Sequence, residues 1–177
     1  MEPGLLLHAL NFAAAKHRDQ RRKDAAKSPY INHPLAVVTM LWDHGVDETV
    51  PLLAAILHDT IEDTGTTREE LAAKFGSDVA SVVVEVTDDK SLPKERRKEL
   101  QVEHAPDLSV NAKLVKLADK ICNLRDLVDS PPADWPEDRK AAYFVWAARV
   151  VAGMRGTHAE LEATFDVQYA RGTGSES

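Results

Sequence analysis

Hydrophobic residues recur every three or four positions along almost the whole of this chain, the spacing that one face of an α-helix requires. No segment of useful length alternates between apolar and polar residues, as a half-buried strand would. The pattern therefore predicts an all-α fold of about eight to ten helices. The expected helices cover residues 5–18, 34–43, 48–63, 67–75, 78–88, 93–104, 109–128, 137–153 and 156–168.

These segments are predicted to form one compact domain that spans residues 1–170. A chain of 177 residues can bury a sizeable core, and neither a repeat nor a linker divides it. The polar tail at 171–177 is expected to be disordered. One alternative concerns 78–88, because the β-branched run Val82–Val84 is also compatible with a short strand.

Two helix starts bring polar side chains next to the expected core. Before the second helix, Asn32 or His33 can act as the N-cap, while Pro34 suits the first helical position. Since proline disfavours helical geometry in the residue before it, His33 is expected at the helix mouth and not within a helical face. The long helix starts at Ser109, and its predicted core stripe consists of Val110, Leu114, Leu117, Ala118, Ile121, Leu124 and Val128.

The predicted helix at 48–63 ends in an unusual concentration of charge. On a continuous helix, the side chains of His58, Asp59, Glu62 and Asp63 all fall within about 140° of one another, opposite the apolar side. Carboxylates are unfavourable at a helix C-terminus, where the macrodipole is negative, and Asp59 repels Asp63 one turn away. A cation, most simply a metal ion, would neutralise this cluster.

The composition is that of an ordinary globular protein, with 44% hydrophobic and 29% charged residues. The net charge of −7 argues against general binding to nucleic acids or anionic membranes, which depends on neutralising phosphate groups. The single cysteine, Cys122, excludes an intrachain disulfide and is expected to be a small core residue. Neither a signal peptide nor a membrane span is recognisable, so a cytoplasmic location is expected.

Two further residues complete a possible metal site. Asp119 lies at the edge of the apolar stripe of its helix and needs a positive partner, and His33 stands before Pro34. Each residue alone is readily explained as an ion pair or a cap. Together with His58 and Asp59 they form a mixed nitrogen and oxygen set that suits Mn²⁺, Fe²⁺ or Zn²⁺. Without a set of thiolates, the sequence argues against a structural zinc site.

These residues resemble the H…HD…D signature of the HD phosphohydrolase superfamily. Longer segments are similar to the hydrolase domain of Rel/SpoT-type alarmone enzymes, and most of all to its stand-alone members, the small alarmone hydrolases (the metazoan SpoT homologue group). The similar segments are Arg22-Lys23, 29–34, 58–64, 86–90 and 117–126. The resemblance covers roughly residues 5–165, and these segments in this order are far more specific than the His-Asp pair alone.

The resemblance implies an HD-type helical domain that removes the 3′-pyrophosphate from guanosine tetra- or pentaphosphate with a single Mn²⁺ ion. It implies that the metal ligands are His33, His58, Asp59 and Asp119. Glu62 and Asp63 would be the catalytic acids, and either could position or deprotonate the attacking water.

The resemblance also implies a set of substrate-binding residues. Arg22 would stack on the guanine and Lys23 would contact a phosphate, while Lys94 would reach the 5′-diphosphate. Asn123 would bind the ribose or its phosphate, and Tyr143 would pack near the nucleoside. The remaining basic residues are interpreted as solvent-exposed surface, namely Arg18, Arg21, Arg96, Arg97, Lys98, Lys113, Lys116 and Lys120.

Two departures from the long Rel enzymes stand out. Asp126 occupies a position where those enzymes carry a threonine, although the small stand-alone members also have an aspartate there. No segment corresponds to the synthetase and regulatory domains, so the chain is expected to degrade the alarmone without making it. The tryptophans Trp42, Trp135 and Trp146 are expected to be packing anchors and not a platform for nucleic acid.

Two other functions fit the same residues. The site could act as a phosphatase on another nucleotide, such as the 2′-phosphate of NADPH, or the protein could be a non-catalytic sensor of the alarmone. A sensor need not keep both Glu62 and Asp63 beside four metal ligands, which favours an enzyme. The expected partner is therefore a small guanosine substrate, with neither nucleic acid nor membrane.

Overall fold

The computed structural model describes residues 2–174 of the chain. Over this range it contains ten α-helices and one 3₁₀-helix, which confirms the predicted all-α fold. The elements are α1 (Pro3–Lys16), α2 (Asn32–Asp43), α3 (Thr49–Leu57), α4 (Thr60–Asp63), α5 (Arg68–Phe75), α6 (Ser77–Val86), α7 (Lys94–His104), the 3₁₀-helix η1 (Ala105–Asp107), α8 (Val110–Asp129), α9 (Glu137–Ala152) and α10 (Ala159–Thr173).

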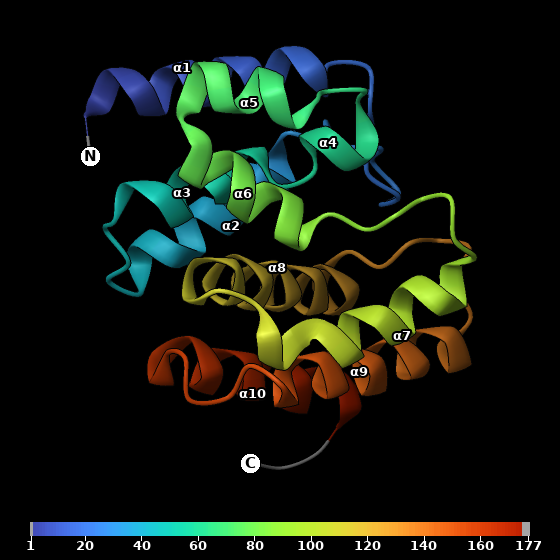
Figure 1. Ribbon diagram of the computed structural model, residues 1–177. Helices are drawn as coiled ribbons and strands as arrows, with labels where there is room; N and C mark the ends of the chain where they lie inside the picture. Colours follow the sequence, from blue (N-terminus) through green and yellow to red (C-terminus); the bar gives the residue numbers. More distant parts are fainter. Residues whose placement is uncertain (1, 175–177) are drawn as a thin grey trace.

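The helix α8 runs through the middle of the molecule, with α1–α6 on one side and α7, α9 and α10 on the other (Figure 1). It packs against α2, α3, α6, α9 and α10. Leu117, Ile121 and Leu124 on α8 are fully buried, as the apolar stripe predicted, whereas Val110 in its first turn is 66% exposed. The predicted start is confirmed, because the side chain of Ser109 accepts a hydrogen bond from the backbone N–H of Ala112.

The helix α3 lies inside the core, with every residue from Pro51 to Leu57 buried. It does not continue to Asp63 as the sequence suggested, because His58 and Asp59 form a turn before α4 begins, although the backbone angles of His58 are still helical. The backbone of Asp59 has φ −97° and ψ −1°, which opens the turn, and the Thr60 hydroxyl donates to the Leu57 carbonyl at 2.7 Å. The single-helix geometry assumed for the four polar side chains was therefore wrong, and His58 and Asp59 lie at a break between two helices.

The start of α2 also differs from the prediction. Neither Asn32 nor His33 is the N-cap, since α2 already begins at Asn32 and Ile31 precedes it without a side-chain cap. His33 is helical although Pro34 follows it, so the expectation that proline keeps it out of helical geometry was wrong, although it lies in the first turn of α2. The preceding turn explains this, because the His33 N–H already bonds to the Tyr30 carbonyl at 2.9 Å and thereby winds the chain into the helix.

Two other sequence alternatives are decided by the structure. Val82–Val84 lie within α6, so the strand alternative is excluded. The helix α10 continues to Thr173, past residue 171 where a tail was expected, and residues 175–177 lie outside the described part of the chain. Among the described residues, no helix combines the length and the apolar character that crossing a membrane requires.

Candidate active site

A cavity of about 710 Å³ opens beside α8. Its walls come from the loop after α1, from α2, from the α3–α4 break, from α8 and from α9. It is lined by all four predicted metal ligands and both predicted acids, together with Arg22, Lys23, Asn123 and Tyr143. Lys94 is the one predicted site residue that does not line it.

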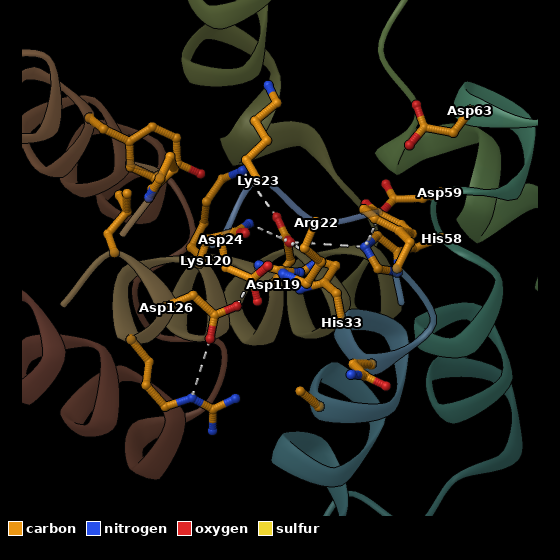
Figure 2. Close-up of a pocket in the computed structure, with 18 of the residues that line it drawn as sticks. Arg22, Lys23, Asp24, His33, His58, Asp59, Asp63, Asp119, Lys120 and Asp126 are labelled. Atoms are coloured by element: carbon orange, nitrogen blue, oxygen red, sulfur yellow. Dashed lines mark hydrogen bonds and ion pairs between the residues drawn. The ribbon is translucent and has the colours of Figure 1, made fainter. Parts of the chain in front are cut away.

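Three of the predicted metal ligands converge in this cavity. His33, His58 and Asp119 each offer a ligand atom, and these atoms lie within 4.8 Å of one another. His33 Nε2 is 3.0 Å from Asp119 Oδ1, and His58 Nε2 is 3.9 Å from the same oxygen. Figure 2 shows His33, His58 and Asp119 facing one another. They come from α2, the α3–α4 break and α8, so the fold assembles this group from distant parts of the chain.

The orientation of His58 fits a metal ion. Its Nδ1 lies 2.7 Å from the Ala55 carbonyl oxygen, which leaves Nε2 directed at Asp59 and Asp119. Asp59 Oδ2 is 2.9 Å from Nε2, yet this nitrogen makes no hydrogen bond of acceptable geometry with any described residue. A histidine that ligates a metal commonly donates its other N–H to a carbonyl in this way. The donor set therefore fits a divalent cation bound by nitrogen and oxygen.

The electrostatics of the site also favour a cation. Burial acts to lower the pKa of His58, but the Asp59 and Asp119 carboxylates outweigh burial and raise that pKa to about 9. Burial acts to raise the pKa of Asp119, but Lys120 and His33 hold it well below its usual value. Burial also acts to raise the pKa of Asp59, but the His58 charge holds it below its usual value. Both carboxylates are thus ionised in a confined space, and metal binding would displace the His58 proton.

The carboxylate of Asp59 is positioned by a residue that the sequence analysis missed. The Tyr30 hydroxyl donates a hydrogen bond to Asp59 Oδ2. Burial and the Asp59 charge raise the pKa of Tyr30 well above its usual value, so the phenol keeps its proton. The ring packs against His17 and His33, with centroid distances of 5.0 and 5.9 Å. Its one sequence signal was its place in the segment 29–34. The role of Asp59 as a fourth ligand stays a prediction.

The two predicted acids, although adjacent, have different surroundings. The Asp88 N–H donates to Glu62 Oε2 at 3.1 Å, and burial raises the pKa of Glu62. Asp63, whose side chain is about as exposed as that of Glu62, accepts hydrogen bonds from the Gln20 amide at 2.8 Å and from the Lys90 ammonium. In Figure 2, Asp63 lies farther from Asp119 than Asp59 does. A half-buried carboxylate with a raised pKa suits proton transfer, whereas Asp63 is held by two partners.

Two predicted substrate residues bind other side chains of the cavity. Arg22 forms an ion pair with Asp126, a residue 104 positions later, so Asp126 joins the site. Asn123 donates from Nδ2 to Asp119 Oδ1 at 2.6 Å, which makes it a positioning partner of that carboxylate. Lys23 is exposed where it lines the cavity.

Two lysines that were expected at the surface are buried in the cavity wall. Lys116 is 7% exposed and Lys120 is 3% exposed, so the surface interpretation was wrong for both. Lys120 Nζ lies 3.1 Å from Asp119 Oδ2 and 4.6 Å from the centre of the Trp146 ring. Lys116 Nζ donates to the Val86 carbonyl at 3.1 Å. The physical reason is that α8 has neighbours on several sides, so its polar side chains also face other elements.

Aromatic residues form the α9 side of the cavity. Tyr143 packs against Trp135 and Trp146, with ring centroids 5.9 and 5.0 Å apart. The indole of Trp146 donates to the Lys98 carbonyl at 3.0 Å, which ties α9 to α7. Trp42 is 58% exposed on α2, so its predicted anchoring role was wrong, because helical spacing alone did not reveal which face of α2 is buried.

Comparison with known proteins gives several close matches. The profile of the HD domain family matches residues 9–157. A protein of Xenopus tropicalis named guanosine-3′,5′-bis(diphosphate) 3′-pyrophosphohydrolase MESH1 is 57% identical over 166 residues, which cover 93% of each chain. A human protein of the same name is 56% identical over 162 residues, covering 91% of this chain and 90% of that protein.

Longer proteins and solved structures extend these matches. The GTP pyrophosphokinase rsh of Brucella melitensis is 40% identical over 129 residues, which cover 70% of this chain and 17% of that protein. The fold is similar to that of a metazoan SpoT orthologue that hydrolyses ppGpp and plays a role in starvation responses. That likeness has a TM-score of 0.94 and 46% identity over 99% of both chains. A protein of Listeria monocytogenes EGD-e is similar with a TM-score of 0.65 and 28% identity, covering 81% of this chain and 97% of that one.

Proposed function

The chain is a hydrolase of the HD domain family, in its small alarmone hydrolase group, and on this premise we propose that it is a Mn²⁺-dependent 3′-pyrophosphohydrolase of guanosine-3′,5′-bis(diphosphate). The products would be GDP, or GTP from the pentaphosphate, together with pyrophosphate. The observation that carries the proposal is a single cavity lined by a cation-binding group, by the half-buried Glu62 and by Arg22.

The metal would be held by His33, His58 and Asp119, with Asp59 as the fourth ligand. Manganese suits this mixed nitrogen and oxygen set, which Zn²⁺ or Fe²⁺ also fits. When bound, the ion would lower the pKa of a water molecule and polarise the phosphoryl oxygens. Asn123 and Lys120 hold Asp119 in place, and Tyr30 holds Asp59, so the chain fixes the direction of both carboxylates.

Glu62 would be the base of the reaction. Hydrolysis forms a bond between the water oxygen and the phosphorus attached at the 3′ position, and it breaks the bond between that phosphorus and the 3′-oxygen. Glu62 would accept a proton from the water, and the departing 3′-oxygen takes up a proton to become the hydroxyl of the product. One Glu62 oxygen is bonded to the Asp88 N–H, while the other has Lys90 and Arg97 at 4.0 Å, which leaves it available. Asp63 would orient the α4 side of the cavity through Gln20 and Lys90.

The nucleotide would lie between the loop after α1 and α9. Arg22, held by Asp126, would stack its planar guanidinium on the guanine, and Tyr143 would pack near the nucleoside. Lys23 would contact a phosphate. Lys94 would reach the 5′-diphosphate as that group extends beyond the cavity. Asn123 would contact the ribose at the same time as it holds Asp119.

Product analysis by ion-exchange chromatography tests this proposal. Metal-stripped protein is supplied with Mn²⁺ and given guanosine tetraphosphate and NADPH in parallel tubes. The expected products are GDP and pyrophosphate, formed only when Mn²⁺ is present. If phosphate is released from NADPH and the alarmone is not hydrolysed, the assigned substrate is wrong. If the alarmone binds tightly and neither nucleotide is turned over, the assigned enzymatic activity is wrong.

A further inference from the structure

Two sets of basic residues lie near the cavity, and they meet at Trp146, whose ring centre is 5.3 Å from Lys98 Nζ and 4.6 Å from Lys120 Nζ. The charges that act on Lys94 include those of Arg139, Lys98 and Lys23, and this group lies at the exposed α7–α9 side. Lys116 has different neighbours, because the charges that act on it are those of Lys120, Asp88, Asp119 and Glu62. A substrate with two separate polyphosphate arms, as in the proposed function, would match two such groups.

Lys116 is unusual because its ammonium group is buried without an ion-pair contact among the described residues, although Asp88, Asp119 and Glu62 act on it from farther away. It is 7% exposed, and within residues 2–174 Nζ donates one hydrogen bond, to the Val86 carbonyl, whereas an ammonium can donate three. Burial and the nearby Lys120 lower the pKa of Lys116 to about 8. For packing alone, an apolar side chain of the same length would be more favourable at this position. The position therefore points to a ligand that the ammonium serves.

The wall around Lys116 contains two further polar atoms that lack partners. Arg97 Nε and Gln101 Oε1 are both buried without a hydrogen-bond partner among the described residues. Gln101 and Lys116 line the main cavity and also a smaller one of about 170 Å³ behind it, which Arg97 lines as well. Arg97 Nη1 is 4.0 Å from Glu62. Arg97 and Lys116 therefore belong to the same wall of the cavity as the proposed base, Arg97 by contact with it and Lys116 as a more distant charge.

We propose that Lys116 is a substrate-contacting residue that binds the pyrophosphate arm attached at the 3′ position, an inference that rests on the proposed function. Lys116 lines the same cavity as Glu62 and Asp119, so its ammonium faces the space in which the reacting phosphorus would lie. The Lys94 group would serve the 5′ arm. As water adds to that phosphorus and the bond to the 3′-oxygen breaks, the ammonium balances the negative charge on the phosphoryl oxygens. The same contact holds the pyrophosphate product until it leaves.

Binding of inorganic pyrophosphate to the Mn²⁺-loaded protein tests this assignment without any turnover. Calorimetric titrations would compare wild type with Lys116→Met, which keeps the length of the side chain and removes its charge. We expect pyrophosphate to bind about tenfold more weakly to this variant, with Mn²⁺ affinity unchanged. Lys113→Met is the matched control, since Lys113 lies one turn earlier on α8, bonds to the Pro106 carbonyl and does not line the cavity.

Two further variants keep the test decisive. Lys116→Gln removes the charge but retains a donor for the Val86 carbonyl, so it replaces Lys116→Met if that variant fails to fold. Lys116→Arg keeps the charge and should bind pyrophosphate within about threefold of wild type. If both charge-free variants bind pyrophosphate with wild-type affinity, the role of Lys116 is overturned, whereas the proposed alarmone hydrolysis is not affected. If the charge-free variants lose pyrophosphate binding but the wild-type protein does not hydrolyse the alarmone, the proposed substrate is refuted instead.

Discussion

The metal end and the nucleotide end of the cavity are built in different ways. At the metal end, His33 and His58 are buried, and Asp119 is bonded to Lys120 and Asn123. At the nucleotide end, Lys23 is exposed and Arg22 is held by an ion pair. Burial fixes the first group when the chain folds, whereas the second would be completed by the proposed ligand. Metal-end substitutions should therefore act on metal binding and turnover together, and nucleotide-end substitutions on substrate affinity.

The strongest test of this difference is Asp119→Ala, which removes the carboxylate that both histidines approach. We expect loss of metal binding and a decrease in turnover of about 10³-fold or more. Metal content by mass spectrometry and the rate of alarmone hydrolysis measure the two effects. Asp129→Ala is the control, because Asp129 lies at the end of the same helix and pairs with the exposed Arg171. Retention of the metal by Asp119→Ala would refute the assignment of the centre.

Glu62→Gln should separate chemistry from metal binding. The variant should keep the metal and lose about 10²–10⁴-fold in kcat, because the amide cannot accept a proton. Since burial raises the pKa of Glu62 and the base must be ionised, kcat of the wild type should fall as pH decreases through that pKa. This acidic limb should be absent from the residual activity of Glu62→Gln. A larger loss of kcat in Asp63→Asn than in Glu62→Gln would mean that Asp63, and not Glu62, is the base.

Tyr30→Phe tests whether hydrogen bonds from neighbouring residues are needed to orient the predicted metal ligands. Without its hydroxyl, Asp59 loses a donor, and Mn²⁺ affinity should fall by about 10–100-fold. Metal titration at constant pH measures this change. Tyr169→Phe, in the distant contact between α9 and α10, provides the control. Unchanged Mn²⁺ affinity would mean that Asp59 is oriented by the fold alone.

The smallest expected effect comes from Arg22→Ala at the nucleotide end. It should raise KM for guanosine tetraphosphate by about tenfold and leave Mn²⁺ affinity unchanged, because the proposed contact of the guanidinium is with the base and not with the ion. Inorganic pyrophosphate binding, measured in parallel, should not change. Arg18→Ala, an exposed arginine in the same loop, is the control. An equal loss for pyrophosphate would exclude the stacking role.

The convergence of His33, His58 and Asp119 was expected from the sequence, because the charge crowding at His58 and Asp59 indicated a cation site. The all-α fold followed from periodicity in the same way. Lys116 and Tyr30 were not predictable, since a lysine in a basic run and a tyrosine before a helix acquire their roles from the elements packed against them. The break between α3 and α4 depends on the backbone angles of Asp59 and on the Thr60 hydroxyl, and the spacing of apolar residues does not reveal either.

The buried helix α3 couples metal binding to the folding of the whole protein. His58 follows directly on a helix that is buried from Pro51 to Leu57, so its imidazole is in place only in the folded chain. An ion that binds there and not to the unfolded chain stabilises the protein by mass action, by about 2.7 kcal/mol when its concentration is 100 times the dissociation constant. The supply of metal would then set the lifetime of the enzyme in a cell as well as its rate.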